Sequence, residues 1–253
     1  LLEGTVVKNE VAVLYSYDEL WALEIQPNNP RLKYTEVVSE YYRCLHERNV
    51  GVDFVNHDDD FSQYKVLIAP LIYMVSPNLA AKLGEFVRRG GVLITNFRSG
   101  VKDWDNIVTD KPLPGELADL LGIEIGDYDS FYGDGVGIKL ELDGEVLEGS
   151  ADTWCDIITS HSAKTLGTYT SEYYASEAAV TENAVGEGRA MYIGTRLDSN
   201  LTAKLVDYAL SKAGASRGLL GNGGIEVAVR EKGSIQLIFL LNHTDQKQSA
   251  ALP

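Results

Sequence analysis

The first half of the chain alternates between short apolar runs and amphipathic segments. Apolar runs predict β-strands at residues 11–16, 65–70 and 91–96, and an alternating pattern predicts one at residues 51–56. Apolar side chains at helical spacing predict helices at residues 31–49, 76–90 and 113–122, and Ser76-Pro77 and Gly90 are typical start and end signals of the second. Continuous apolar strands separated by helices predict a flavodoxin-like or loosely Rossmann-like fold, in which helices cover both faces of a parallel sheet.

The pattern changes to short alternating strands in the middle of the chain. Two of them flank Asp143-Gly144, a pair typical of a type I′ hairpin turn, and further short β segments follow. We therefore expect an antiparallel β insertion at about residues 130–186. An apolar strand at 189–195 and a capped helix at 198–214 then return the chain to the α/β pattern.

The end of the chain forms a third region. We expect the α/β domain to span residues 1–217 and residues 218–253 to begin a C-terminal β-sandwich. The second region contains a predicted hairpin with Lys232-Gly233 at its turn, and a third strand would start at the last residues. A two- or three-stranded meander is a poor domain by itself, so the rest of the sandwich is expected beyond this sequence. The first residues, which lack an initiator Met, look like the start of a fragment.

The net charge of the chain disfavours two classes of partner, and the positions of its cysteines disfavour a metal site. The formal net charge is −15, which disfavours binding to nucleic acid and to anionic membranes. No apolar run is long enough to span a bilayer. Cys44 and Cys155 lie in a predicted helix and a predicted strand without CxxC spacing, so buried free thiols are expected rather than a metal site, with a disulfide as the alternative.

Motifs for catalysis and cofactors are missing from the expected positions. The turn after the first strand has no G-x-G-x-x-G, and no P-loop occurs. Neither cysteine lies on the strand-to-helix elbow that an amidotransferase nucleophile needs. The acidic clusters "HDDD" and "DYD" lack EF-hand spacing and are interpreted as solvated loops. We predict no catalytic residue, no cofactor and no metal in this chain.

The stretch "YDELWALEIQ", interpreted as the loop after the first strand, carries three carboxylates around a tryptophan. A retaining glycosidase holds its two carboxyl groups roughly 5–5.5 Å apart. On a helix, Glu19 and Glu24 would point about 140° apart, and in an extended loop they would lie further apart still. They are therefore not expected to form a catalytic pair, although a role in lining a neighbouring cleft stays open.

Several segments resemble a known family. "WALE", "FVRRGGVLIT" and "RSGVKDWDN" resemble the second domain of family 42 glycoside hydrolases, the bacterial β-galactosidases, and "FLLNHT" resembles the start of that family's C-terminal β domain. The resemblance implies a class I glutamine amidotransferase-like α/β fold without amidotransferase chemistry. It implies a trimerisation domain that forms a homotrimer, in a cytoplasmic enzyme that hydrolyses terminal non-reducing β-D-galactosides. In that family both catalytic glutamates belong to a preceding barrel, so galactoside would be bound only through the barrel.

The resemblance also provides candidate residues for a substrate rim or an interface. Trp21 and Glu24 match the family pattern in "WALE", and Arg98, Asp103 and Asn106 match it in "RSGVKDWDN". Packing or a subunit interface is favoured for Trp21 over the rim of a sugar cleft. A structural ion pair or a loop-locking bond is favoured for Arg98 and Asp103. The alternatives left open are a carbohydrate-binding module and a standalone amidotransferase-like enzyme.

Overall fold

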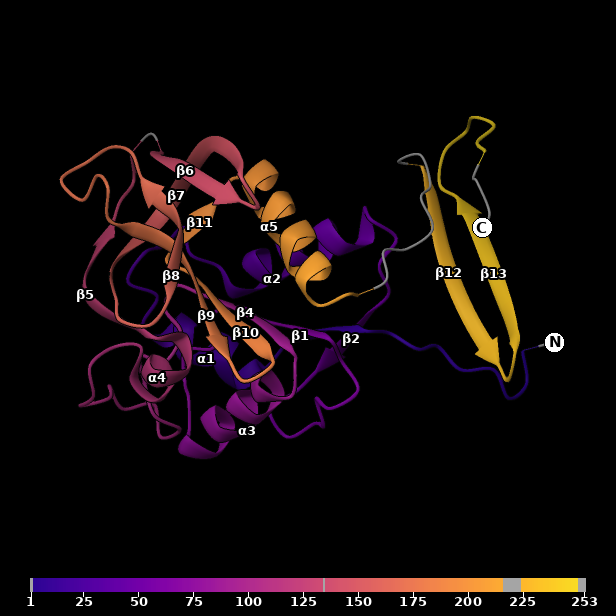
Figure 1. Cartoon of the computed structure of the whole chain (residues 1–253), viewed down its shortest axis with the longest axis horizontal. Helices are drawn as coiled ribbons and strands as arrows, with labels where there is room; N and C mark the ends of the chain where they lie inside the picture. The colour runs from indigo at the N-terminus through magenta and orange to yellow at the C-terminus, as the bar shows by residue number, and fades with distance from the viewer. Residues whose placement is uncertain (1, 134, 216–223, 250–253) are drawn as a thin grey trace.

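The computed structural model describes residues 2–133, 135–215 and 224–249. Within them, a single mixed sheet of eleven strands forms the body of the protein (Figure 1). Five of its strands run parallel in the order β2 (Val52–Val55), β1 (Val11–Leu14), β3 (Val66–Ala69), β4 (Val92–Asn96) and β10 (Gly188–Ile193). All five coincide with predicted strands. β1, β3 and β4 are apolar runs that are fully buried, whereas β2 alternates and keeps Phe54 exposed at the margin of the sheet.

Helices cover both faces of the parallel strands, as predicted. On one face, Val13 and Ile68 belong to the apolar core beneath α1 (Tyr17–Ile25), α2 (Tyr34–His46) and α5 (Ser199–Lys212). On the other, Leu14 and Leu67 pack with α3 (Pro77–Arg88) and with α4 (Ala118–Leu121), which follows a 3-10 turn at Gly115–Leu117. Figure 1 shows α2 and α5 on one side of the sheet and α3 and α4 on the other. Adjacent strand residues therefore supply two separate cores.

The predicted helix signals act as expected. The Ser76 side chain accepts a hydrogen bond from the Leu79 N–H at 3.1 Å, and the Asp198 side chain accepts one from the Leu201 N–H at 2.9 Å. No described helix combines the length and the apolarity needed to cross a membrane.

The antiparallel strands extend the same sheet. They are β5 (Ile123–Ser130), β6 (Val136–Leu142), β7 (Glu145–Ser160), β8 (Lys164–Tyr169), β9 (Ala178–Val185) and β11 (Thr195–Leu197). β9 pairs with β10, which joins them to the parallel half. Asp143 and Gly144 both have positive φ, as a type I′ turn requires. Two short segments predicted within residues 145–160 are one long strand, β7, in which Thr153 adopts a φ of 68°.

The C-terminal hairpin forms a separate two-stranded sheet of β12 (Ile225–Lys232) and β13 (Ile235–Asn242), as predicted. The sequence did not predict that the N-terminal segment pairs with it. Val6 and Glu231 exchange backbone hydrogen bonds of 2.9 and 2.8 Å, and the Arg230 Nε donates to the Thr5 hydroxyl. The expected boundary at 217/218 and the expected third strand at 250–253 lie outside the described residues.

Candidate functional site at the carboxyl edge of the parallel strands

The stretch "YDELWALEIQ" is a helix, so its interpretation as a loop was wrong. Helix α1 begins directly after β1, where the Ser16 side chain accepts a hydrogen bond from the Asp18 N–H at 3.2 Å. Asp18 and Glu19 in the first turn also favour a helix N-terminus. The capping serine is visible in the sequence, but the acids around Trp21 were interpreted as possible active-site residues of a loop.

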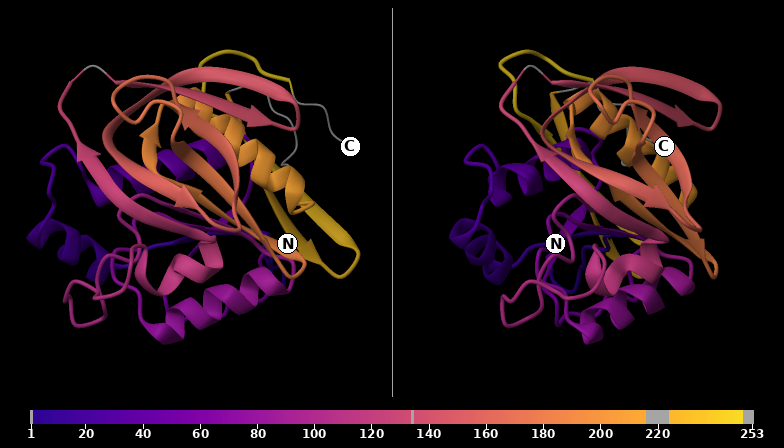
Figure 2. Two further views of the ribbon diagram at one scale, coloured as in Figure 1. Left: turned by 60° about the vertical axis from the view of Figure 1, so that its left-hand side comes forward. Right: turned by 90° about the vertical axis from the view of Figure 1, so that its left-hand side faces the viewer.

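Helix α1 presents an apolar stripe to solvent. Tyr17, Trp21 and Ile25 follow one another at intervals of four residues and are 61%, 57% and 72% exposed. The rings of Tyr17 and Trp21 are neighbours, with centroids 5.9 Å apart. In the right-hand view of Figure 2 the indigo N-terminal helices lie at the left-hand margin of the molecule. We name Tyr17, Trp21 and Ile25 the α1 stripe. An ordinary surface helix exposes polar residues instead.

The buried side of α1 carries a carboxylate. Glu19 is fully buried; its Oε2 accepts a hydrogen bond from the Met74 N–H at 3.0 Å, and its Oε1 lies 3.2 Å from Nε2 of His57. Neither Oε1 nor Nε2 has a hydrogen bond of good geometry with any described residue, so the two side chains are in close contact without a well-aligned hydrogen bond. Burial raises the pKa of Glu19, while the contacts with His57 and Met74 lower it.

Glu19 lies at the carboxyl ends of three parallel strands. Glu19 follows β1, His57 follows β2, and Met74 follows β3. The crevice outside the carboxyl ends of such strands, where the strand order reverses, is the usual ligand site of doubly wound sheets. Here the order reverses between β1 and β3, and the Glu19 side chain occupies that place. Sequence reasoning missed this role because its partners lie 38 and 55 residues away along the chain.

Arg98 lies in a column of aromatic rings. It is 6% exposed and its Cζ lies 4.6 Å from the Trp154 ring and 4.8 Å from the Tyr73 ring. Tyr128 stacks on the other side of Trp154 at 4.5 Å. Arg98 Nη2 donates to the Tyr73 hydroxyl at 2.8 Å and to Asn28 Oδ1 at 3.1 Å. The expected ion pair was wrong, because no described carboxylate lies within 4 Å of Arg98 and π-stacking holds the guanidinium instead.

Asp103 and Asn106 close the loop that follows β4. Asp103 Oδ1 accepts hydrogen bonds from the N–H groups of Asp105 and Ile107 at 3.0 and 2.9 Å. Asn106 adopts a φ of 62°, and its Oδ1 accepts a hydrogen bond from Lys102 Nζ at 2.7 Å. Asp103 therefore forms the loop-locking bonds that were one of its two predicted roles.

The loop brings further exposed apolar side chains to the same edge as α1. They are Trp104, Ile107 and Val108. The Trp104 ring packs edge-on against His57 at 5.0 Å, and His57 in turn contacts Glu19 of α1. Trp21 and Glu24 are exposed on α1, whereas Arg98 is buried. The five predicted site residues therefore lie on α1, in the loop after β4 and in the buried aromatic column, and the structure does not gather them at one exposed site.

Asp156 of β7 is a second buried carboxyl group with a raised pKa. Its carboxylate accepts hydrogen bonds from Trp154 Nε1 at 2.8 Å and from the Tyr192 hydroxyl at 2.6 Å. Burial raises the pKa of Asp156 to about 6, although these two donors and the nearby charge of Arg98 lower it. Because the folded-state pKa exceeds the unfolded one, Asp156 contributes stability that is present below about pH 3.8 and is lost as the pH rises through 6.

Asp156→Asn should remove this pH dependence. Between pH 5 and pH 8, the unfolding free energy of the wild-type protein should fall by about 1.4 kcal/mol more than that of Asp156→Asn. Urea unfolding at both pH values measures the difference, and Asp119→Asn on the exposed side of α4 is the matched charge control. Equal pH dependence of wild type and Asp156→Asn would contradict the assignment.

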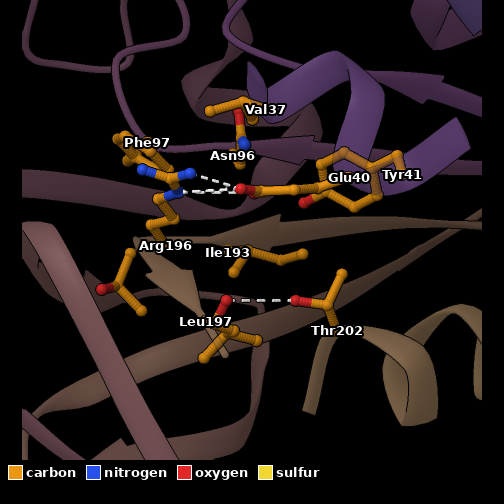
Figure 3. Close-up of a pocket in the computed structure, with 10 residues that line it drawn as sticks. Val37, Glu40, Tyr41, Asn96, Phe97, Ile193, Arg196, Leu197 and Thr202 are labelled. Carbon is orange, nitrogen blue, oxygen red and sulfur yellow. Dashed lines mark hydrogen bonds and ion pairs between the residues drawn. The ribbon is translucent and has the colours of Figure 1, made fainter. Parts of the chain in front are cut away.

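The cavity in Figure 3 cannot hold a substrate. It lies between α2, β4 and the segment after β10, where Arg196 and Glu40 point toward one another and form an ion pair. Its volume is about 10 Å³, room for about one water molecule. Among the described residues, no group of three or more His, Cys, Asp or Glu could hold a metal ion. Cys44 and Cys155 are free and buried, as predicted.

Fold and edge together define an α/β domain whose exposed aromatic side chains suit association with another protein surface. Residues 9–216 match the family model described as the β-galactosidase trimerisation domain. The chain belongs to this family, within glycoside hydrolase family 42. Over its whole length it is 36% identical to the β-galactosidase BgaB of Geobacillus sp. (strain Y412MC61), and over 97% of it 34% identical to the β-galactosidase LacZ of Heyndrickxia coagulans.

Solved structures agree. The β-galactosidase of Bacillus circulans sp. alkalophilus superimposes with a TM-score of 0.92 at 32% identity over 96% of this chain, and that of Rahnella sp. R3 with 0.90 at 28% over 99%. The chain spans 36–38% of the length of these four relatives. It therefore corresponds to one part of such proteins.

Proposed function

We propose that this chain assembles a bacterial β-galactosidase into a homotrimer and contributes no catalytic residue of its own. The family model names trimerisation, and relatives of which this chain covers only 36–37% are named β-galactosidases. Hydrolysis of terminal non-reducing β-D-galactosides would then belong to a part of the protein outside this sequence. Galactoside would be bound there, and a cytoplasmic location stays a prediction from the resemblance.

The α1 stripe is the observation that carries this proposal. Three large apolar side chains on one exposed helix face are unusual for a protein that stays monomeric, and Trp and Tyr are the residues most enriched at binding hot spots. The loop after β4 adds the exposed apolar side chains of Trp104, Ile107 and Val108, and Trp104 is linked to α1 through His57 and Glu19. We propose that this edge contacts a second copy around a threefold axis, with Trp21 near its centre.

A flavodoxin-like or amidotransferase-like ancestry is the finer part of the proposal. The parallel order β2-β1-β3-β4-β10 supports it, since a 2-1-3-4-5 order is the flavodoxin one. The elbow after β4 carries Phe97 and Arg98 where an amidotransferase has its nucleophile. These residues disfavour a standalone amidotransferase-like enzyme. The separate sheet of β12 and β13 supports a second domain beginning near residue 218.

Light scattering of this chain tests the assembly, and the expected mass is about three times 27.7 kDa. A nitrophenyl β-galactoside should not be hydrolysed by the same sample. Turnover that survives repurification would contradict the non-catalytic role. Heat of binding with millimolar lactose would favour the carbohydrate-binding alternative, whereas a mass of 27.7 kDa at every concentration would contradict self-sufficient trimerisation.

A further inference from the structure

Two buried cations lie around one aromatic ring at the carboxyl edge. Arg98 Cζ is 4.8 Å and Lys102 Nζ is 5.2 Å from the centre of the Tyr73 ring. Arg98 is 6% exposed and Lys102 is 5% exposed. Burial lowers the pKa of Lys102, and the positive charge of Arg98 lowers it further. The two side chains therefore concentrate positive charge in a small, desolvated volume.

Their hydrogen-bond acceptors are all neutral. Arg98 donates to the Tyr73 hydroxyl and to the Asn28 amide oxygen, and Lys102 donates to the Asn106 amide oxygen. The Nε of Arg98 is buried without a hydrogen-bond partner among the described residues. Arg196 and Arg48, which are less deeply buried, have the carboxylate partners Glu40 and Asp207, whereas the half-buried Arg230 and Lys82 donate to neutral oxygens.

The carboxylates that surround this pair are engaged elsewhere. Asp103 accepts two backbone N–H groups of its own loop, and Asp156 accepts hydrogen bonds from Trp154 and Tyr192. Glu19 binds the Met74 N–H and faces His57. Asp156 does act on Arg98 electrostatically, but from beyond 4 Å. Buried charges without a close counter-charge cost folding free energy, so their presence calls for an anion from outside the chain.

Both cations lie just beneath the surface that we propose for assembly. Asn28, which Arg98 binds, is exposed, and Asn106, which Lys102 binds, is half-buried. The loop of Asn106 carries the exposed Trp104, and the column of Arg98 ends at the 43% exposed Tyr128. An acidic side chain of a docked partner could reach the cations from this side with little rearrangement.

We propose that Arg98 and Lys102 receive acidic side chains of a second copy of this chain when the trimer forms. This inference rests on the proposed assembly and names the chemistry of its contact. The chain supplies the complement, because it carries 37 acidic against 22 basic residues and most of the acids are on its surface. The apolar side chains around the cations would exclude water and strengthen the charged contact.

Lys102→Met tests the proposal, because it replaces the cation by an apolar side chain of similar length. In the dilute monomer this change should leave the melting temperature equal or higher, since a desolvated charge is removed. The trimer should nevertheless dissociate at a protein concentration at least about tenfold higher than for wild type. Its dissociation should also depend less on NaCl between 50 and 500 mM. Sedimentation velocity over a dilution series measures both effects.

Arg98→Gln should weaken the trimer in the same direction, and Lys139→Met on the exposed face of β6 is the matched control. A wild-type trimer that Lys102→Met leaves unchanged would overturn this inference and leave the proposed assembly intact. A wild-type monomer at every concentration and salt would overturn both. If Lys102→Met lowers the stability of the monomer and weakens the trimer to a similar degree, Lys102 has a structural role instead of the proposed one. In a last arm, 10 mM phosphate is added to the wild type and to Lys102→Met. If phosphate stabilises the wild type without changing its mass, and does not stabilise Lys102→Met, the cations form a free-anion site and the inference is overturned.

Discussion

Trp21→Arg should convert the trimer into a folded monomer. The Trp21 side chain is 57% exposed, and within the part of the chain that the structure describes its close aromatic neighbour is Tyr17, so an arginine there meets no steric conflict with those residues. In the proposed interface the same arginine would place a charge in the middle of an apolar contact. Truncating a hot-spot residue alone costs about 2–4 kcal/mol of binding free energy, and a buried charge adds to that cost. Light scattering should report the monomer mass at concentrations where the wild type is trimeric.

Phe54→Arg provides the matched control for Trp21→Arg. Phe54 is 53% exposed and lies on β2, the strand at the margin of the parallel half, where it packs against Tyr42. This variant should keep the wild-type mass. Both variants should keep the wild-type melting temperature of the dilute monomer to within about 2 °C, because surface substitutions rarely change stability by more than about 0.5 kcal/mol. A trimer that tolerates Trp21→Arg would contradict the proposed surface.

Glu19→Ala should destabilise the fold more than any surface change at this edge. It leaves the Met74 N–H without its acceptor and removes the carboxyl group that lies against His57, both in a buried site. Leaving a buried donor without its acceptor costs about 1–3 kcal/mol. Chemical denaturation should detect a loss of this size. Because α1 carries the α1 stripe on its other side, the trimer should weaken together with the fold.

Glu19→Gln separates the two contributions. Its amide oxygen can still accept from the Met74 N–H, so the loss should be less than half that of Glu19→Ala. The double variant Glu19→Gln, His57→Phe should cost less than the sum of the single variants, because the two side chains share one contact. Additive losses would show that the Glu19–His57 contact contributes nothing, and a loss below about 1 kcal/mol in Glu19→Ala would contradict the role of Glu19 altogether.

The parallel strands and long helices could be predicted because their signals are local. Each strand is a short, mainly apolar segment of four to six residues, and α3 has a capping serine, a first-turn proline and Gly90 at a φ of 104° just after its end. The turn at Asp143-Gly144 has equally local causes. In these segments the intrinsic preference of the residues and the final fold agree.

Contacts between distant segments could not be predicted in this way. The pairing of Val6 with Glu231 joins residues at opposite ends of the sequence. The column of Tyr128, Trp154, Arg98 and Tyr73 takes one residue from each of four segments. Arg98 followed by Asp103 suggested an ion pair by proximity in sequence, but the fold places aromatic rings around the guanidinium and leaves Asp103 to its own loop.

Helix α1 is hard to recognise from the sequence because its exposed face is apolar. Its apolar side chains occur on both faces, so no amphipathic pattern announces a helix. A helix that is apolar on its exposed face is expected where a second surface covers that face. The ambiguity in the sequence and the proposed interface therefore have the same physical origin, which is the exposed α1 stripe with the buried Glu19 behind it.

A crystal structure of this chain in its assembled form tests the central claim most directly. We expect three copies around a threefold axis, with Trp21 buried against a neighbouring copy and at least one acidic side chain of that copy near Arg98 and Lys102. A threefold assembly in which Trp21 keeps its 57% exposure would contradict the claim that α1 forms the subunit interface.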